Sequence, residues 1–200
     1  MSGTTPLGRL HAKYAEISLR DDRDLTPDDR RSLLYYRADI TPEQSSMESG
    51  SGPALWVRRI RELDAFVARA GRMPRENNRL PRAHISVAER RAAAWVRDQR
   101  KAIGLQQLVS YQIERLDCVP GYSHSPLDER WNARRDTYRD FTVTRGHAPA
   151  YRSIDQAERS LAAWADKQRM YYWKKTLPDR RVRSLEQLPT WTWGSRPPTQ

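Results

Sequence analysis

The chain has 200 residues, with 36 Lys and Arg against 25 Asp and Glu, a net charge of +11 and a single cysteine. One cysteine excludes an internal disulfide and a cysteine-based zinc site. No apolar run approaches the roughly 18 residues of a membrane span, and the N-terminus has no signal-peptide core, so we expect a cytoplasmic protein without a membrane partner.

The positive charge is distributed unevenly along the chain. Residues 1–53 contain 7 basic and 9 acidic side chains, residues 54–125 contain 14 and 7, and residues 126–200 contain 15 and 9. A positive folded surface attracts polyanions, of which nucleic acid is the usual one. The alternative is a merely solvated, arginine-rich surface, because only 5 of the 36 basic residues are Lys.

Residues 1–40 are predicted to form a short helical segment. Leu10, Tyr14 and Ile17 share one face of its first helix. A second helix is predicted to begin at Thr26, because Thr is a good N-cap and the Pro that follows it fits the first turn. Leu25 and Leu33 are eight residues apart, and the same spacing separates Leu108 from Leu116 and Leu177 from Leu185. The segment is therefore either a degenerate partial repeat or an unrelated helical pair.

Residues 41–53 contain Pro, Ser and Gly without an apolar stripe and are predicted to be a linker. Residues 54–122 are predicted to form three helices. The first, over about residues 55–70, has apolar residues at offsets 0, 4, 7 and 11 and ends at Gly71, where a left-handed backbone is needed. The second is predicted to begin at a capping box, Ser86-Val-Ala-Glu89.

Residues 128–194 are predicted to repeat this plan. Their first helix is closed by Gly146, and their second begins at Asp155-Gln-Ala-Glu158. Residues 195–200 are a polar tail. No segment has the pattern of a strand, so the expected fold class is all-α, with two tandem three-helix modules behind a short helical segment.

The two modules are copies of one sequence pattern. Trp95-Val-Arg-Asp-Gln-Arg returns 69 residues later as Trp164-Ala-Asp-Lys-Gln-Arg. The same offset relates Glu89, Leu108, Leu116 and Pro120 to Glu158, Leu177, Leu185 and Pro189, and an offset of 75 relates Trp56, Phe66, Gly71 and Pro74 to Trp131, Phe141, Gly146 and Pro149. Matches at fixed offsets indicate a tandem repeat, with a loop six residues longer in the first copy.

The order of these landmarks resembles the helicase-associated domain family. The family pattern has an opening Trp, a Gly before a Pro, Trp-x-x-x-Gln-Arg, a Leu-started helix, and a closing Pro and aromatic residue. The landmarks are Trp56, Gly71, Pro74, Trp95, Gln99, Arg100, Leu108, Leu116, Pro120 and Tyr122, and then Trp131, Gly146, Pro149, Trp164, Gln168, Arg169, Leu177, Leu185, Pro189 and Trp191.

The resemblance covers about residues 54–194 and implies small three-helix units, often in tandem, that bind nucleic acid and are not catalytic. The first copy departs from the pattern in its longer loop and in ending with Tyr122 rather than Trp. The chain has no G-x-x-x-x-G-K-[ST] loop, which a helicase motor needs to bind phosphates.

No pattern indicates catalysis or a bound metal. His11, His84, His124 and His147 have no partner at the spacing of helical metal ligands, and no G-x-S-x-G motif is present. We therefore expect neither an enzyme nor a cofactor.

Basic residues of the two modules are the candidate nucleic-acid-binding site. Arg90, Arg97 and Lys101 form a stripe at offsets 0, 7 and 11 on the second predicted helix. The further candidates are Arg58 in the first copy and Arg134, Arg159 and Lys167 in the second. Phosphate contacts from two linked modules add together, although an exposed Arg on a helix is usually only solvated.

The Gln-Arg pairs, Gln99-Arg100 and Gln168-Arg169, have two interpretations. In the first, Gln contacts a base edge or sugar, and Arg contacts phosphate or guanine. In the second, Gln bridges helices, and Arg stacks over a tryptophan or pairs with an acid.

The second copy alone contains Tyr171-Tyr172-Trp173-Lys174-Lys175. Tyr172 and Trp173 are candidates to stack on bases while Lys174 and Lys175 bind phosphates. The alternative is that two of the three aromatic residues complete the core.

Together these features favour a nucleic-acid-binding protein, for DNA rather than RNA, with a regulatory or recruiting role. The alternative is a protein–protein adaptor that docks an acidic partner such as a polymerase, a nuclease or a ribosomal assembly.

Overall fold

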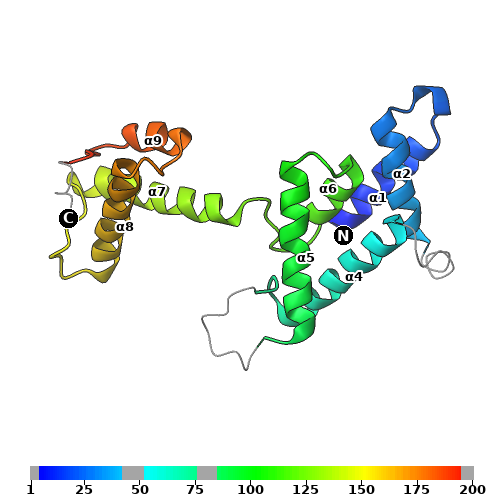
Figure 1. Ribbon diagram of the computed structural model, residues 1–200, viewed down its shortest axis with the longest axis horizontal. Coiled ribbons are helices and arrows are strands. Elements are labelled where there is room, and N and C mark those ends of the chain that lie inside the picture. Colours follow the sequence, from blue (N-terminus) through cyan, green and yellow to red (C-terminus); the bar gives the residue numbers. More distant parts are fainter. Residues whose placement is uncertain (1–4, 42–51, 76–84, 195–200) are drawn as a thin grey trace. The chain divides into compact units, whose positions relative to one another are not determined.

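The computed structural model describes residues 5–41, 52–75 and 85–194. Within these ranges every regular element is a helix, which confirms the predicted all-α class. The chain divides into two compact units, Met1–His124 and Ser125–Gln200. The helices are α1 (Pro6–Ser18), η1 (Asp22–Asp24), α2 (Pro27–Ile40), α4 (Gly52–Ala70), α5 (Val87–Gly104) and α6 (Ser110–Asp117) in the first unit, and α7 (Pro126–Arg145), α8 (Gln156–Trp173) and α9 (Asp179–Glu186) in the second (Figure 1).

Two threonines start the N-terminal helices. The Thr5 hydroxyl accepts a hydrogen bond from the backbone N–H of Gly8 at 3.1 Å. The Thr26 hydroxyl accepts from the N–H of Asp29 at 3.0 Å, and the Asp29 carboxylate accepts from the N–H of Thr26 at 3.0 Å. The second pair is a capping box, and it confirms the predicted start of α2. The apolar face predicted for α1 is buried.

Helices α4, α5 and α6 enclose the main core of the first unit. Its buried residues are Trp56, Val57, Ile60, Leu63, Val67, Val96, Leu116 and Val119. Gly71 follows α4 with a φ of 63°, as predicted. Helix α4 begins at Gly52, so the last two residues of the predicted linker are helical. Residues 42–51 of that linker lie outside the described residues.

The N-terminal helices are part of the first unit. Helix α2 packs against α4 and α6, and α1 packs against α2 and α6 (Figure 1). Tyr111 of α6 is fully buried, with its ring centroid 4.9 Å from that of Tyr14 and 6.0 Å from that of Tyr36. The sequence separated this segment from the first module, and the structure joins them. Its origin as a degenerate repeat stays a prediction.

Helix α2 also caps the N-terminus of α6. The backbone N–H of Ser110 donates to the Asp28 carboxylate at 3.2 Å, and that of Tyr111 donates to the Ser32 hydroxyl at 3.1 Å. The first N–H groups of a helix have no partner inside the helix, so these side chains satisfy donors that would otherwise be unpaired. The start of α6 therefore depends on α2.

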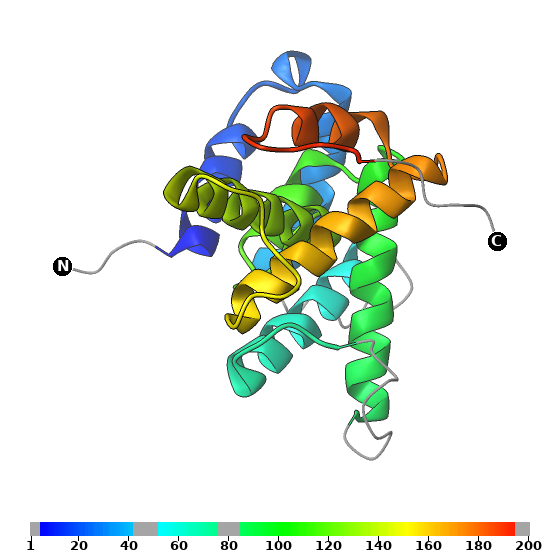
Figure 2. The same ribbon diagram turned by 90° about the vertical axis from the view of Figure 1, so that its left-hand side faces the viewer.

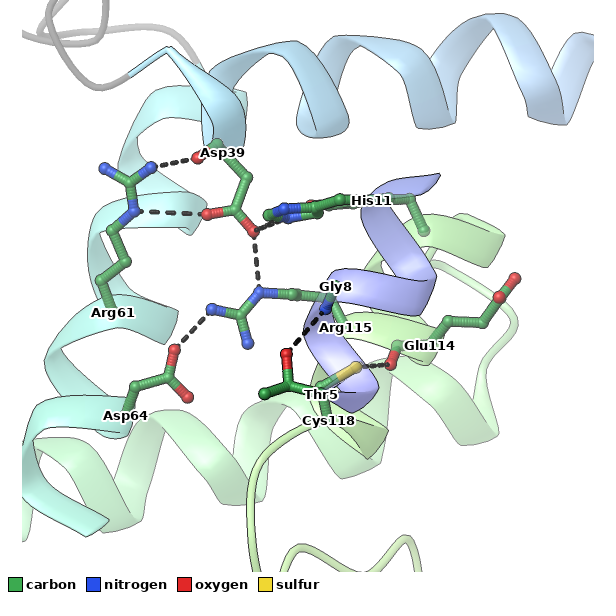
Figure 3. A network of polar contacts seen from close by, with 10 residues as sticks. Thr5, Gly8, His11, Asp39, Arg61, Asp64, Glu114, Arg115 and Cys118 are labelled. Atoms are coloured by element: carbon green, nitrogen blue, oxygen red, sulfur yellow. Dashed lines mark hydrogen bonds and ion pairs between the residues drawn. The ribbon is translucent and has the colours of Figure 1, made fainter. Parts of the chain in front are cut away.

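A buried polar network connects α2 to α4 and α6 (Figure 3). The Asp39 carboxylate accepts hydrogen bonds from Nε of Arg115 at 2.7 Å, from the Tyr111 hydroxyl at 2.8 Å and from Nε of Arg61 at 3.2 Å. Arg115 also donates to Asp64. Burial acts to raise the pKa of Asp39, but the Arg115 charge and these hydrogen bonds outweigh it and hold that pKa below its usual value.

Helices α7, α8 and α9 make up the second unit (Figure 2), and this unit has a core of its own. Its buried residues are Trp131, Tyr138, Leu161, Ala165, Leu177, Leu185 and Leu188. Gly146 follows α7 with a φ of 72°, and its N–H donates to the Thr142 carbonyl at 2.9 Å. This repeats the arrangement at the end of α4 and confirms the predicted helix end.

Two positions of α6 that α2 contacts in the first unit correspond to polar side chains outside the core of the second. Tyr111 and Arg115 correspond, 69 residues later, to Arg180 and Ser184. Arg180 is exposed, and Ser184 accepts a hydrogen bond from Arg135 at 2.8 Å. The second unit therefore leaves no buried aromatic ring or buried guanidinium at these two places that would require a covering helical pair.

Candidate nucleic-acid interface

The opening tryptophan and the glutamine of the motif are hydrogen-bonded in both units. The indole N–H of Trp56 donates to Oε1 of Gln99 at 2.8 Å, and that of Trp131 donates to Oε1 of Gln168 at 2.9 Å. Both glutamines are buried, with 9% and 4% of their surface exposed. The structure corrects the predicted site here, because these amides bridge helices and present no group to a base. The second interpretation of Gln is the one that holds.

The arginine of each Gln-Arg pair contacts the closing segment of its own repeat. Nε of Arg100 donates to the Ser123 carbonyl at 2.7 Å, and its guanidinium lies 5.5 Å from the ring centroid of Tyr122. Nε of Arg169 donates to the Thr192 carbonyl at 2.8 Å, and its guanidinium lies 5.0 Å from the ring centroid of Trp191. These arginines therefore stack as the second interpretation proposed, but on the closing aromatic residue instead of the motif tryptophan. One face of each guanidinium is therefore covered, and the contact with phosphate or guanine stays a prediction.

The glutamate of each predicted capping box contacts the preceding loop. The Glu89 carboxylate accepts from the backbone N–H of Arg75 at 3.0 Å and from Arg72 at 2.6 Å. The Glu158 carboxylate accepts from the backbone N–H of Ala150 at 2.9 Å. The hydrogen bond from Arg72 holds the pKa of Glu89 below its usual value. The two glutamates therefore fix the loop after each proline landmark, a role that the capping-box pattern did not indicate.

The basic stripe of the first unit lies on the exposed side of α5. Arg90, Arg97 and Lys101 are exposed, whereas α5 buries Glu89, Ala93, Val96 and Gln99. Arg97 lies 3.7 Å from the Asp98 carboxylate, an exposed contact of small energetic weight. Arg58 on α4 is exposed as well. These four cations are where the sequence placed them.

The second unit does not repeat this stripe. Arg159, Asp166 and Met170 occupy the equivalent positions, 69 residues later. Arg159 donates to two carbonyls of the preceding loop, at 2.7 Å and 2.8 Å. Arg134 of α7 donates to the Ser160 hydroxyl on α8. The predicted site residues Arg159 and Arg134 thus have structural contacts, and any interface on the second unit differs in composition from that on the first.

The aromatic segment at the end of α8 is partly committed to the core. The Tyr172 ring is parallel to that of Trp193, with 4.0 Å between centroids and 14° between planes. Trp173 is half-buried and packs edge-on against Tyr172 at 5.3 Å. Lys174 and Lys175 are exposed. Tyr172 therefore has one ring face covered by Trp193, and its predicted role, like that of Trp173 and the two lysines, stays a prediction.

A groove of about 660 Å³ lies in the second unit beside this aromatic cluster. Its lining includes Tyr151, Trp173, Trp193, Met170, Lys167 and Arg169. Three of these, Lys167, Arg169 and Trp173, belong to the predicted site. Apolar side chains with a few charged groups in a concave surface are typical of a ligand site.

Sequence reasoning missed Tyr151 and Trp193. Tyr151 lies between α7 and α8 and is 54% exposed, and Trp193 follows α9. A signal existed at Trp193, because the equivalent position of the first copy is His124 and that of Trp173 is Gly104. The second copy therefore has a tryptophan at two positions where the first copy has a glycine and a histidine. In the folded chain both tryptophans line the groove.

The acid in the groove is already engaged. The Asp166 carboxylate accepts from Arg169 at 2.6 Å. Burial, followed by a hydrogen bond with Asp166, raises the pKa of Tyr151. Lys167 on the same helix is exposed, with its ammonium 5.8 Å from the Tyr171 ring centroid. A ligand entering the groove therefore meets aromatic surface and a lysine rather than an unpaired carboxylate.

Comparison of the chain with protein-family models, curated proteins and solved structures gives no match. Within the described part of the chain, no helix has the length and apolar character needed to cross a membrane. The same residues contain no group of three or more His, Cys, Asp and Glu side chains placed to hold a metal ion. The resemblance to the helicase-associated family stays a prediction.

Proposed function

We propose that the protein binds nucleic acid, DNA in preference to RNA, and that it regulates or recruits rather than catalyses. The observation that carries this proposal is the exposed stripe of Arg90, Arg97 and Lys101 on α5. Charge supports it in both units. Residues 1–124 contain 21 Lys and Arg against 16 Asp and Glu, and residues 125–200 contain 15 against 9.

The chemistry of the proposed contact is phosphate neutralisation. Three cations on one helix face meet successive backbone phosphates, and each contact releases condensed counterions. Contacts of this kind position the protein without reading sequence. We therefore propose sequence-tolerant or weakly specific binding. The resemblance to the helicase-associated family, whose implied role is nucleic-acid binding, agrees with this.

The test is the salt dependence of binding. The affinity of the full chain for duplex DNA should fall steeply with salt, with log K losing about 0.9 per unit of log salt for each phosphate neutralised. Replacing Arg90, Arg97 and Lys101 with Ala should reduce this slope by up to about three and weaken all sequences alike. A triple replacement of exposed Arg20, Arg23 and Arg31 removes the same charge from the N-terminal helices and is the matched control.

An adaptor that docks an acidic protein is the second candidate. Tyr151 and Ile154, both between α7 and α8, are 54% and 100% exposed. Exposed apolar side chains close together in the chain are a common feature of protein interfaces. Affinity weaker than millimolar for every nucleic acid at low salt would reject the leading proposal and leave this one.

A further inference from the structure

We propose that the groove of the second unit binds an unpaired base of single-stranded nucleic acid, stacked on its aromatic side chains. This inference rests on the proposed nucleic-acid-binding function and adds to it the form of nucleic acid that the second unit prefers. It assigns to Tyr151, Trp173 and Trp193 a role that the basic stripe on α5 cannot supply.

The groove offers aromatic and apolar surface that is held in place. Tyr151 is 54% exposed and Met170 is 38% exposed, while Trp173 and Trp193 are half-buried. Trp193 is fixed because Tyr172 is stacked on it at 4.0 Å. Ring surfaces of this kind accept the flat face of any base, because every base has a π-face.

The charged groups around the groove suit a phosphate-bearing ligand. Asp166, the acid of the groove, is bonded to Arg169 at 2.6 Å, and Lys167 is exposed beside it. Lys174 and Lys175, which directly follow Trp173, are exposed too. A base placed on the rings would bring its phosphates near these lysines, which is the combination of stacking and cationic contact found in single-strand binders.

Single strands and duplexes differ in what they can present to these rings. In a duplex the faces of a base are covered by its neighbours, and presenting one costs a few kcal/mol of unstacking. In a single strand the faces are accessible at little cost. The first unit has Gly104 and His124 where the second has Trp173 and Trp193, so we infer a division in which the first unit contacts backbone and the second unit contacts bases.

The experiment uses the full chain and three fluorescein-labelled probes, an oligothymidylate, an oligouridylate and a duplex, each of about twelve nucleotides per strand, within the site size of such binders. Tyr151→Ala and Trp173→Ala should each weaken binding of both single strands by between about 5-fold and 150-fold, the equivalent of one lost stack. Duplex binding should change by less than about twofold, because no stack on the groove is made there. Comparing the two single strands distinguishes DNA from RNA as the source of the base.

Lys101→Ala is the matched control, because position 101 in the first copy corresponds to Met170 in the groove. It should weaken single strands and duplex by the same factor. Tyr151 lies outside the helices and is more than half exposed, so its replacement should leave the circular dichroism and melting temperature unchanged.

If both aromatic variants bind the single strands as tightly as the parent, the groove proposal is overturned while nucleic-acid binding stands. Equal weakening of single-strand and duplex binding by these variants would overturn the groove proposal as well. If the parent binds none of the three probes, the proposed function itself is rejected together with the groove.

Discussion

At Gln99 and Gln168 a polar side chain serves the fold where a binding role was also plausible. Glutamine suits a base edge and a helix bridge equally well, because its amide carries both donors and an acceptor. The spacing of four residues from the motif tryptophan fixes only the helix face. What decided the outcome is a third residue, Trp56 or Trp131, which is 43 or 37 positions away and has an indole N–H in need of an acceptor.

Replacing Gln99 with Ala should destabilise the first unit, and Gln168→Ala should do the same in the second. Each change leaves a buried indole N–H without its acceptor, which costs about 1–3 kcal/mol. The free energy of unfolding, measured in urea by circular dichroism, should fall by this amount while affinity for duplex DNA stays unchanged. Gln107→Ala, at an exposed glutamine, is the control. A loss of affinity without a loss of stability would restore the base-contact interpretation.

At the scale of the helices, α1 and α2 act as a cover for α6 and α4. Asp39 lies 76 positions from Arg115 in the chain, and Ser32 lies 79 positions from Tyr111. The apolar face of α1 and the start of α2 were predictable because they depend on neighbours within a few residues. Their packing was not, because a carboxylate on α2 does not reveal from its own surroundings which distant arginine it meets.

This packing can be tested by producing residues 1–41 and 52–200 as two separate chains in the same cell. We expect the short chain to stay bound to a tagged long chain, because together they bury the Asp39–Arg115 pair and the tyrosine cluster around Tyr111. Asp39→Ala in the short chain should reduce its recovery, since it removes the buried carboxylate that accepts hydrogen bonds from Arg115, Tyr111 and Arg61 and so breaks a buried ion pair between the two chains.

Asp24→Ala, at an exposed acid of the short chain, is the control for this experiment and should leave recovery unchanged. A long chain that is recovered folded and soluble without the short one would contradict the role of α1 and α2 as a required cover.

At the scale of the whole molecule, the sequence repeat and the helices of each copy could be predicted, but the groove of the second unit could not. Three helices were predicted in each copy, and the structure has α4, α5 and α6 in the first and α7, α8 and α9 in the second; they were predictable because their apolar residues face one local core in each unit. The groove was not readable, because Tyr151 precedes α8 and Trp193 follows α9, and only the fold brings them to Lys167 and Trp173. The sequence signal for the groove was a difference between the copies, because Trp173 and Trp193 replace Gly104 and His124 of the first copy.

The two units should differ in their ability to fold alone. Residues 125–200 keep a closed core and carry Arg180 and Ser184 where the first unit buries Tyr111 and Arg115. We expect this fragment to be helical and to unfold cooperatively in urea with a free energy of at most about 3–5 kcal/mol, which a core of this size rarely exceeds. Residues 52–124, without α1 and α2, should show no cooperative transition. Equal behaviour of the two fragments would contradict this asymmetry.

The Trp–Gln bond present in each unit gives the molecule two built-in spectroscopic probes. The indole protons of Trp56 and Trp131 are both buried and hydrogen-bonded, one in each unit. Each can exchange with solvent deuterium only when its own core opens, so its exchange rate measures the local opening free energy. Two indole resonances in a proton NMR spectrum would thus follow the two units independently within the intact chain, including while a ligand is added to one of them.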